Sequence, residues 1–214
     1  MARPELRQMI EKGEVFFAPA VWDAITARLA RHLGFKVIYV PGSGTGIVVG
    51  ESEPMIDLTQ KAMVAERALE GVADELPMIV DLECGYGNAI HVQLAIRTLE
   101  DAGVTAVHIE DQLYPQRAHY FRGVEHIIPI EEYQQRIEYA VKAKRSKDFL
   151  IIARNDASQE KAVEGGTREE AVVRAHAAME AGADLIFVIG IQADRGDLEY
   201  YRKEIKNIPL VTVP

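Results

Sequence analysis

The stretch that decides the fold, P-M-I-V-D-L-E-C-G-Y-G-N at residues 77–88, is an apolar run that ends in two carboxylates and then breaks into glycines. Side chains alternate between the two faces of a strand, so Asp81 and Glu83 are expected to share one face. Gly85 and Gly87 then end the strand and open a loop, which leaves the acids at the carboxyl end of the strand instead of buried without partners. The stretch therefore predicts a chemical site at the end of a β-strand.

Outward from this stretch, short apolar runs alternate with longer helical patterns, which predicts βα units around a parallel sheet. Seven strands are expected, at residues 15–19, 36–41, 77–83, 105–111, 149–156, 183–189 and 209–213. Helices are expected at residues 22–32, 58–69, 91–101, 130–145, 167–180 and 198–205. Gly34, Gly103 and Gly182 each stand between a helix and a strand, where a left-handed helix stop favours glycine.

Two architectures fit such alternation, an open doubly wound sheet and a (β/α)8 barrel. Acids, Arg or Asn close several different strands, which is how the active sites of barrels are assembled. An open sheet that binds nucleotides would favour a Gly-rich turn after the first strand, and P-A-V-W-D-A stands there instead. We therefore expect an α/β fold of the (β/α)8 barrel type, in one domain over residues 1–214, whose sequence stops before an eighth βα unit.

Composition limits the function classes. Of 214 residues, 48% are hydrophobic and 27% are charged, and no run of twenty apolar residues or apolar signal core is present. We therefore expect a soluble protein with neither a membrane span nor secretion. The net charge of −9 argues against nucleic acid as a ligand, because phosphate binding needs clustered Lys and Arg. The single cysteine, Cys84, cannot form an internal disulfide, which is typical of a reducing compartment such as the cytoplasm.

A metal site is predicted from carboxylates on two neighbouring strands. His108 and Glu110 are expected on one face of their strand, as Asp81 and Glu83 are on theirs. If both faces point into the barrel mouth, the three acids converge on a space that suits one ion, because neighbouring strands lie roughly 5 Å apart. An oxygen-only shell favours Mg2+ or Mn2+ over zinc. The alternative is that these acids cap helices or pair with Lys and Arg.

Residues 112–126 form a long polar loop between a strand and the next helix. The loop carries Arg117, His119, Tyr120 and Arg122, which could bind an anion or transfer a proton. Loops of this length are commonly lids or binding segments. The alternative for each residue is a solvated surface position.

Arg154 ends the apolar run F-L-I-I-A-R-N-D-A and is the expected partner of an anionic substrate, since a planar guanidinium binds a carboxylate through two hydrogen bonds. Its alternative is an internal ion pair with Asp156 or Glu110. The glycines of G-S-G-T-G at residues 42–46 offer backbone N–H groups to an oxyanion, although a flexible turn explains them as well. Cys84 is expected to pack structurally, and nearby negative charge would raise its pKa.

Taken in order, several motifs resemble the isocitrate lyase and phosphoenolpyruvate mutase superfamily over nearly the whole chain. They are P-A-V-W-D-A-I-T-A-R-L-A, Y-V-P-G-S-G-T-G, D-L-E-C-G-Y-G-N, V-H-I-E-D-Q, Y-P-Q-R-A-H and I-I-A-R-N-D-A. They resemble the family's opening helix, its Gly-Ser substrate loop, its first metal motif, the next metal carboxylate, the mobile gating loop and the substrate-arginine strand. Together these motifs are specific, whereas singly most are not.

The resemblance implies a (β/α)8 barrel, usually in tetramers that exchange the last helix between subunits, and we expect a homo-oligomer, either a dimer or a tetramer. It implies that Asp81, Glu83 and Glu110 hold Mg2+, directly or through water. For the substrate it implies the following residues: Tyr39, Gly42, Ser43, Gly44, Asn88 and Arg154. His119 and Tyr120 in the loop are then candidate proton donors.

Three departures from the family pattern stand in the sequence. Where the lyases of the superfamily carry K-[KR]-C-G-H, residues 116–119 are Q-R-A-H, so the cysteine that is their general acid is absent. The second acid of the metal motif is Glu83 rather than Asp. The sequence stops before the eighth strand and the exchanged helix.

We expect a Mg2+-dependent enzyme that cleaves a C–C bond of a small 2-oxo or 2-hydroxy dicarboxylate through an enolpyruvate-like intermediate. The absent loop cysteine favours a decarboxylase over a lyase with an aldehyde or keto leaving group. One alternative is a mutase or hydrolase that acts on the C–P bond of phosphonopyruvate. Another is a non-catalytic barrel retained for binding or assembly.

Overall fold

The computed structural model describes residues 3–72, 75–116, 126–159, 163, 165–191 and 195–213. Its strands are β1 Ile38–Val40, β2 Met78–Asp81, β3 Ala106–Ile109, β4 Leu150–Asn155, β5 Leu185–Val188 and β6 Leu210–Val211. Its helices are α1 Pro4–Glu11, α2 Ala24–His32, α3 Gly42–Val49, α4 Leu58–Gly71, α5 Ala89–Asp101, α6 Ile130–Ala143, α7 Arg168–Glu180, α8 Arg195–Glu204 and the short 3-10 helix η1 Glu53–Met55. Among the described residues, no helix is long and apolar enough to span a membrane.

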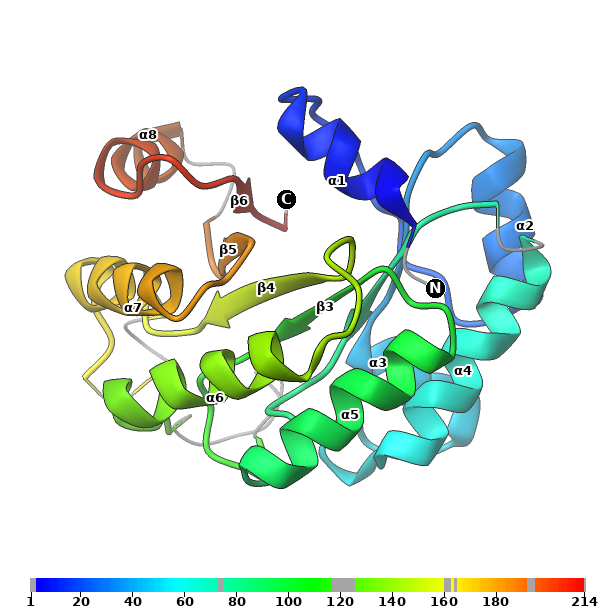
Figure 1. Ribbon diagram of the computed structural model, residues 1–214, viewed down its shortest axis with the longest axis horizontal. Helices are drawn as coiled ribbons and strands as arrows, with labels where there is room; N and C mark the ends of the chain where they lie inside the picture. Colours follow the sequence, from blue (N-terminus) through cyan, green and yellow to red (C-terminus); the bar gives the residue numbers. More distant parts are fainter. Residues whose placement is uncertain are drawn as a thin grey trace.

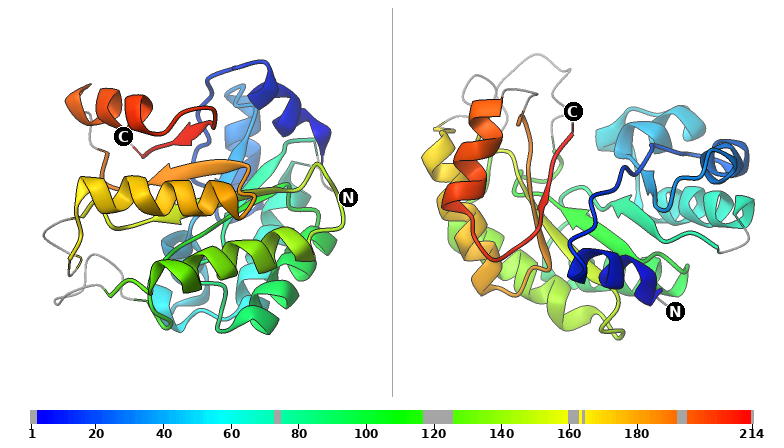
Figure 2. Two further views of the ribbon diagram at one scale, coloured as in Figure 1. Left: turned by 60° about the vertical axis from the view of Figure 1, so that its left-hand side comes forward. Right: turned by 90° about the horizontal axis from the view of Figure 1, so that it is seen from above.

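The six strands pair in parallel, in chain order from β1 to β6. The sheet curls, and helices α4 to α7 cover its outer side, as Figures 1 and 2 show. Each strand from β1 to β5 is followed by a helix that returns the chain to the start of the next strand, as right-handed βα units require. The prediction of an α/β fold of parallel βα units is confirmed, in the form of a curled half-barrel of six strands among the described residues.

Two apolar layers lie on the two faces of this sheet. On the outer side, residues such as Val80 and Val107 pack with the helices. On the inner side, Ile79 and Ala106 pack with Leu6 of α1, which lies against the concave face. Because strand residues alternate between faces, the inner layer continues toward the carboxyl ends as the polar side chains Asp81, His108 and Arg154. The carboxyl edge of the concave face is therefore where the sequence places its chemistry.

The glycine stops predicted after three helices are confirmed. Gly34, Gly103 and Gly182 have φ angles of 84°, 93° and 94°, so each adopts the left-handed stop that the sequence predicts. Thr167 is the N-cap of α7 and accepts a hydrogen bond of 2.9 Å from the N–H of Glu170.

The predicted strand at residues 15–19 is wrong. The segment does alternate, with Phe16 and Ala18 packed toward the inner layer and Val15 94% exposed, but it forms no ladder. Its contact with the sheet is a single bridge between Ala20 and Tyr39. Pro19 interrupts the run and has no N–H to donate, which limits pairing at this edge.

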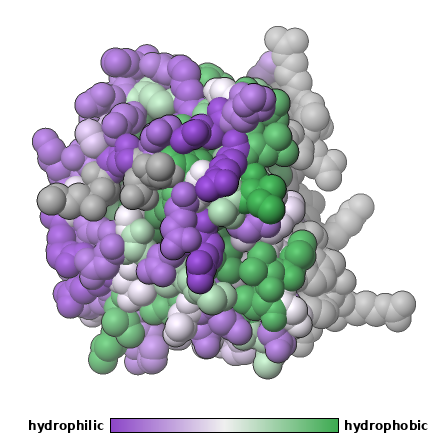
Figure 3. All heavy atoms as spheres, turned by 90° about the vertical axis from the view of Figure 1, so that its right-hand side faces the viewer, coloured by the Kyte–Doolittle hydropathy of each residue, from purple (hydrophilic) through white to green (hydrophobic). Residues whose placement is uncertain are grey.

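Helix α2 carries an apolar stripe on the outside of the fold. Ile25, Leu29 and Leu33, four residues apart, are 77%, 55% and 63% exposed. The face of the molecule in Figure 3 has both hydrophobic and hydrophilic side chains.

No feature of the described residues tests the predicted homo-oligomer, which stays a prediction.

Candidate metal and substrate site

Asp81 is the last residue of β2 and is held by a set of donors. Its Oδ1 accepts a 2.9 Å hydrogen bond from the N–H of Glu83, and its Oδ2 accepts one of 3.2 Å from the N–H of Gly42, the first residue of α3. The Tyr39 hydroxyl lies 3.5 Å from the same Oδ2. The positive end of the α3 dipole therefore points at this carboxylate, which favours its charged form.

The pKa of Asp81 reflects opposing effects. Burial is the largest and acts to raise the pKa, but His108, Lys61 and Arg154 together outweigh it and bring the pKa to about 2. Asp81 is therefore ionised at neutral pH.

His108 lies beside Asp81 on the neighbouring strand, in register with it. Its Nε2 is 2.9 Å from the Tyr39 hydroxyl, and Phe187 meets the ring edge-on at 5.4 Å. Burial lowers the pKa of His108 to about 4, so the ring is neutral at neutral pH and the 3.5 Å approach of its Nδ1 to Asp81 Oδ1 is not an ion pair there. Within the described residues this buried Nδ1 has no hydrogen-bond partner.

Glu83 lies just beyond β2, with a φ angle of 54°. Glu83 lies beyond the strand, so the expectation that it shares a strand face with Asp81 is wrong. Its side chain reaches the inner side because its backbone is left-handed. Lys61 Nζ donates to Glu83 Oε1 at 2.8 Å, and Gln116 Nε2 donates to Oε2 at 2.6 Å. Burial, followed by the charge of Asp81, raises the pKa of Glu83 to about 8 despite Lys61.

The acids that lie within ligand distance of one another are Asp81, Glu83 and Glu53, whose chosen oxygens all fall within 4.8 Å. Glu53 opens η1, on the segment that follows α3. Gly42 makes the approach possible, because a Cβ there would lie 2.5 Å from Glu83 Oε1 and closer still to the Glu53 carboxylate. These three residues are called the acid triad below.

The acid triad fits a hard divalent cation. Its donors are all carboxylate oxygens, which is the set that Mg2+ and Mn2+ prefer. Burial first, and then the charges of Asp81 and Glu53, raise the pKa of Glu83, so added positive charge would favour its ionised form. Lys61 supplies one such charge to Glu83, and a divalent cation would supply two more.

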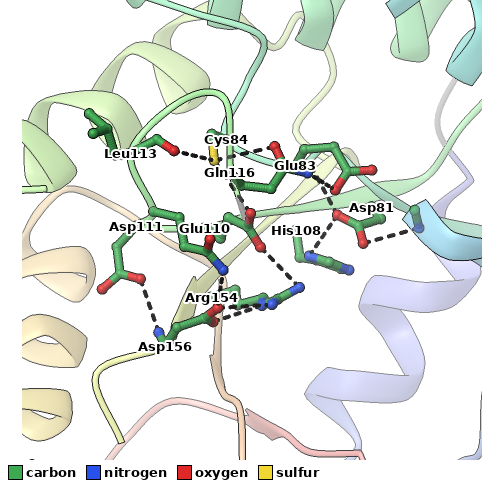
Figure 4. A network of polar contacts seen from close by, with 12 residues as sticks. Asp81, Glu83, Cys84, His108, Glu110, Asp111, Leu113, Gln116, Arg154 and Asp156 are labelled. Carbon is green, nitrogen blue, oxygen red and sulfur yellow. Dashed lines mark hydrogen bonds and ion pairs between the residues drawn. The ribbon is translucent and has the colours of Figure 1, made fainter. Parts of the chain in front are cut away.

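Glu110, the third predicted metal ligand, lies in a neighbouring cluster that Figure 4 shows. Its Oε2 is 3.0 Å from Arg154 Nη1, and its Oε1 accepts a 3.3 Å hydrogen bond from the thiol of Cys84. Arg154 also binds both oxygens of Asp156, at 2.9 and 3.0 Å. The ion pairs that the sequence left open as the alternative for Arg154 are both present, and the metal role of Glu110 stays a prediction.

The other predicted site residues differ in where they lie. Residues 42–46, expected as a loop, open helix α3, with Ser43 exposed and Gly44 buried. Asn88 is exposed and caps α5, where its Oδ1 accepts from the N–H of Ile90. His119 and Tyr120, like Arg117 and Arg122, lie outside the described residues.

Sequence reasoning missed two members of the site, Glu53 and Lys61. Glu53 stands in E-S-E-P, seven residues after the glycine run. An acid in the segment after the second predicted strand could have been considered as a further ligand beside Asp81 and Glu83. Lys61 interrupts the buried face of α4, whose other members include Ala65. A lysine on the apolar face of a helix is a usable signal for a buried ion pair.

The family model of phosphoenolpyruvate phosphomutase matches residues 6–214. The chain belongs to this family. Among its relatives, a 2-methylisocitrate lyase from Aeropyrum pernix is 40% identical over 183 residues, which cover 85% of this chain and 56% of that protein. An oxaloacetate decarboxylase from Pseudomonas putida is 33% identical over 207 residues, covering 97% and 68%. The chain thus spans little more than half the length of the first of these relatives.

Solved structures of the phosphoenolpyruvate phosphomutase family and its superfamily share the fold. A 2,3-dimethylmalate lyase, named as a member of the PEP mutase/isocitrate lyase superfamily, matches with a TM-score of 0.86 and 30% identity, over 99% of this chain and 72% of that one. A phosphonopyruvate hydrolase in complex with oxalate and Mg++ matches with a TM-score of 0.86 and 28% identity, over 100% and 72%. The resemblance expected from the motifs is confirmed, and the relatives are lyases, decarboxylases and a hydrolase.

Proposed function

We propose that this chain is a Mg2+-dependent carbon–carbon lyase that acts on a small 2-oxo or 2-hydroxy dicarboxylate, with decarboxylation of an oxaloacetate-like acid as its reaction. The observation that carries the proposal is the acid triad, of which Asp81 and Glu83 lie near Arg154 at one edge of the concave face (Figure 4). The names of the relatives, among them an oxaloacetate decarboxylase, support it.

Asp81, Glu83 and Glu53 would hold the cation. When bound, a Mg2+ ion supplies Lewis-acid stabilisation of the negative charge that grows on the substrate's oxygens. Asp81 suits the role of the permanent ligand, because its pKa of about 2 keeps it charged. Glu83, with a pKa of about 8, would give up its proton as the cation is bound.

Arg154 would orient the substrate's carboxylate. Its Nη1 contacts Glu110, and its Nη2 donates a hydrogen bond to Asp156. Each of these nitrogens carries a second hydrogen that could be donated to a substrate. The side chain is 12% exposed, and the two acids fix its plane. The N–H groups at the start of α3, around Gly42 and Ser43, are the second proposed contact.

The sequence of the loop favours decarboxylation. Loss of CO2 from a 2-oxo dicarboxylate leaves the electron pair on the carbon next to the oxo group, as an enolate of pyruvate, and the departing CO2 needs no proton. When a 2-hydroxy acid is cleaved to an aldehyde or ketone, a base takes the hydroxyl proton, and the electron pair of the broken C–C bond stays on the other fragment, whose carbanion needs a proton from a general acid. Residues 116–119, Q-R-A-H, lack the cysteine that the related lyases use in this loop.

The test is an assay of the full chain with Mg2+ and oxaloacetate, in which pyruvate is detected by a coupled dehydrogenase and compared with the spontaneous decarboxylation of a blank. We expect Mg2+-dependent release of pyruvate that EDTA abolishes. Glu83→Gln should abolish turnover, and Glu70→Gln, an exposed acid on α4, should leave it unchanged. The absence of metal-dependent turnover of any 2-oxo or 2-hydroxy dicarboxylate would refute the proposal.

The second candidate reaction is cleavage of the C–P bond of phosphonopyruvate, which the match to a phosphonopyruvate hydrolase favours. Phosphate release from phosphonopyruvate, with no pyruvate released from oxaloacetate, would establish C–P cleavage in place of decarboxylation. Calorimetry with oxalate, an enolpyruvate mimic, separates both from a non-catalytic barrel retained for binding or assembly. A catalytic site should bind oxalate only with Mg2+, and Arg154→Ala should abolish that binding.

A further inference from the structure

Lys61 is a fully buried lysine on helix α4 whose ammonium contacts the acid triad. Its side chain has 0% exposure, and its Nζ lies 2.8 Å from Glu83 Oε1. It stands in the first turn of α4, where the helix dipole disfavours a cation. Burial of the charge is also unfavourable unless a partner compensates it. Glu83 is therefore the contact that allows a charged group at this place.

The oxygen that Lys61 binds faces the rest of the acid triad. Glu83 Oε1 is the atom that a Cβ on Gly42 would meet, next to the Glu53 carboxylate. The other oxygen, Oε2, accepts a hydrogen bond of 2.6 Å from Gln116 Nε2. Lys61 and a divalent cation at the acid triad would therefore act on the same oxygen of Glu83.

We propose that Lys61 is an internal counter-ion that competes with the divalent cation for Glu83 and so weakens metal binding at the acid triad. The inference rests on the proposed function, because it assumes that the acid triad is the metal site. In the metal-free protein the ammonium offsets part of the negative charge of the acid triad. When a cation binds, this positive charge remains close to it and repels it.

The competing explanation is that Lys61 is a structural ion pair with no effect on the metal. The two explanations predict different changes in metal affinity when the charge of Lys61 is removed. Removal of a merely structural partner disorders Glu83 and leaves metal affinity unchanged or lower. Removal of a competing charge raises metal affinity even though the metal-free protein becomes less stable.

The experiment is a titration of the metal-free full chain with Mn2+, followed by electron paramagnetic resonance of the free ion, without substrate. The variants are Lys61→Met, which keeps the length of the side chain without the charge, and Lys61→Arg, which keeps the charge. Arg67→Met is the matched control, because it removes a cation from the exposed side of the same helix. We expect Lys61→Met to lower the Kd for Mn2+ at least about tenfold, as removal of a nearby like charge predicts. Arg67→Met should bind Mn2+ as the native chain does, and Lys61→Arg should bind it as the native chain does or more weakly.

The outcomes separate this inference from the proposed function. If the native chain binds no Mn2+, the metal site fails and the inference with it. If the native chain binds Mn2+ and Lys61→Met binds it no more tightly, the inference is overturned and the metal site stands. If Lys61→Met does not fold, Lys61→Gln, which keeps a donor to Glu83 without the charge, must show the tighter binding, and its failure to do so overturns the inference equally.

Discussion

In the absence of metal, the stability of this protein is expected to fall as the pH rises from 5 to 8, because Glu83 must ionise in a buried site. Its pKa is about 8 in the folded chain and 4.5 as an ordinary value. The folded state therefore binds more protons than the unfolded state between these limits, and the free energy of unfolding decreases with pH until the folded pKa is passed. At 1.36 kcal/mol for each pH unit, the contribution of Glu83 to this decrease from pH 5 to 8 is about 4 kcal/mol.

This decrease can be measured as a melting temperature. For a chain of this size, about 4 kcal/mol corresponds to roughly 8–16 °C. Thermal unfolding would be recorded in EDTA between pH 5 and 8 for the native chain, for Glu83→Gln and for Glu70→Gln. Asp111, whose pKa burial and Asp156 raise to about 7, contributes in the same direction, and His108, whose pKa burial lowers to about 4, contributes in the opposite direction below about pH 6.5. Glu83→Gln should therefore give a flatter profile than the native chain. Asp81, with its pKa of about 2, is ionised throughout this range.

The result that would refute the reasoning is a Glu83→Gln variant with the native pH profile, since the loss of stability would then have another source. Glu70→Gln should retain the native profile, because Glu70 is 65% exposed. Addition of Mn2+ should remove most of the decrease in the native chain and little of it in Glu83→Gln.

Three further predictions follow from the contacts of the site. Arg154→Met should lower the free energy of unfolding by about 3–5 kcal/mol, because it leaves buried acids without their cation. Arg67→Met, at the exposed ion pair with Glu70, should leave the same denaturant titration nearly unchanged. Gly42→Ala should displace Glu83, with a destabilisation of about 1–3 kcal/mol and loss of Mn2+ binding by titration. Asp57→Ala should cost about 1 kcal/mol through loss of the N-cap of α4, with unchanged Mn2+ affinity in the folded protein. Equal metal binding by Gly42→Ala and the native chain would contradict the close approach at Gly42.

Much of the fold could be predicted from the sequence because its signals are local. The expected helix at residues 130–145 is α6, Ile130–Ala143, and the expected helix at 167–180 is α7, each within two residues at either end. Both helices follow a hydrophobic period, and Thr167 caps the start of α7, so neighbouring positions in the chain decide them. The strand at 15–19 was wrong because a ladder depends on a partner far along the chain.

The site was predictable only in part. Asp81 follows from the end of an apolar run, and Tyr39 and Gly42, singled out by resemblance, do lie against it. Nothing within a few residues of Glu53 or Lys61 indicates their proximity to Glu83, because each comes from a different element.

By itself, then, the sequence determined the order of βα units, the glycine stops between them, and the acids at the end of β2, since each depends on local backbone and side-chain preferences. Tertiary structure alone decided which acids meet: Glu53 with Asp81 and Glu83, and Glu110 with Arg154. The physical reason is that parallel strands and their loops bring together residues from distant parts of the chain. A left-handed turn at Glu83 and the bare Cα of Gly42 then set the final distances.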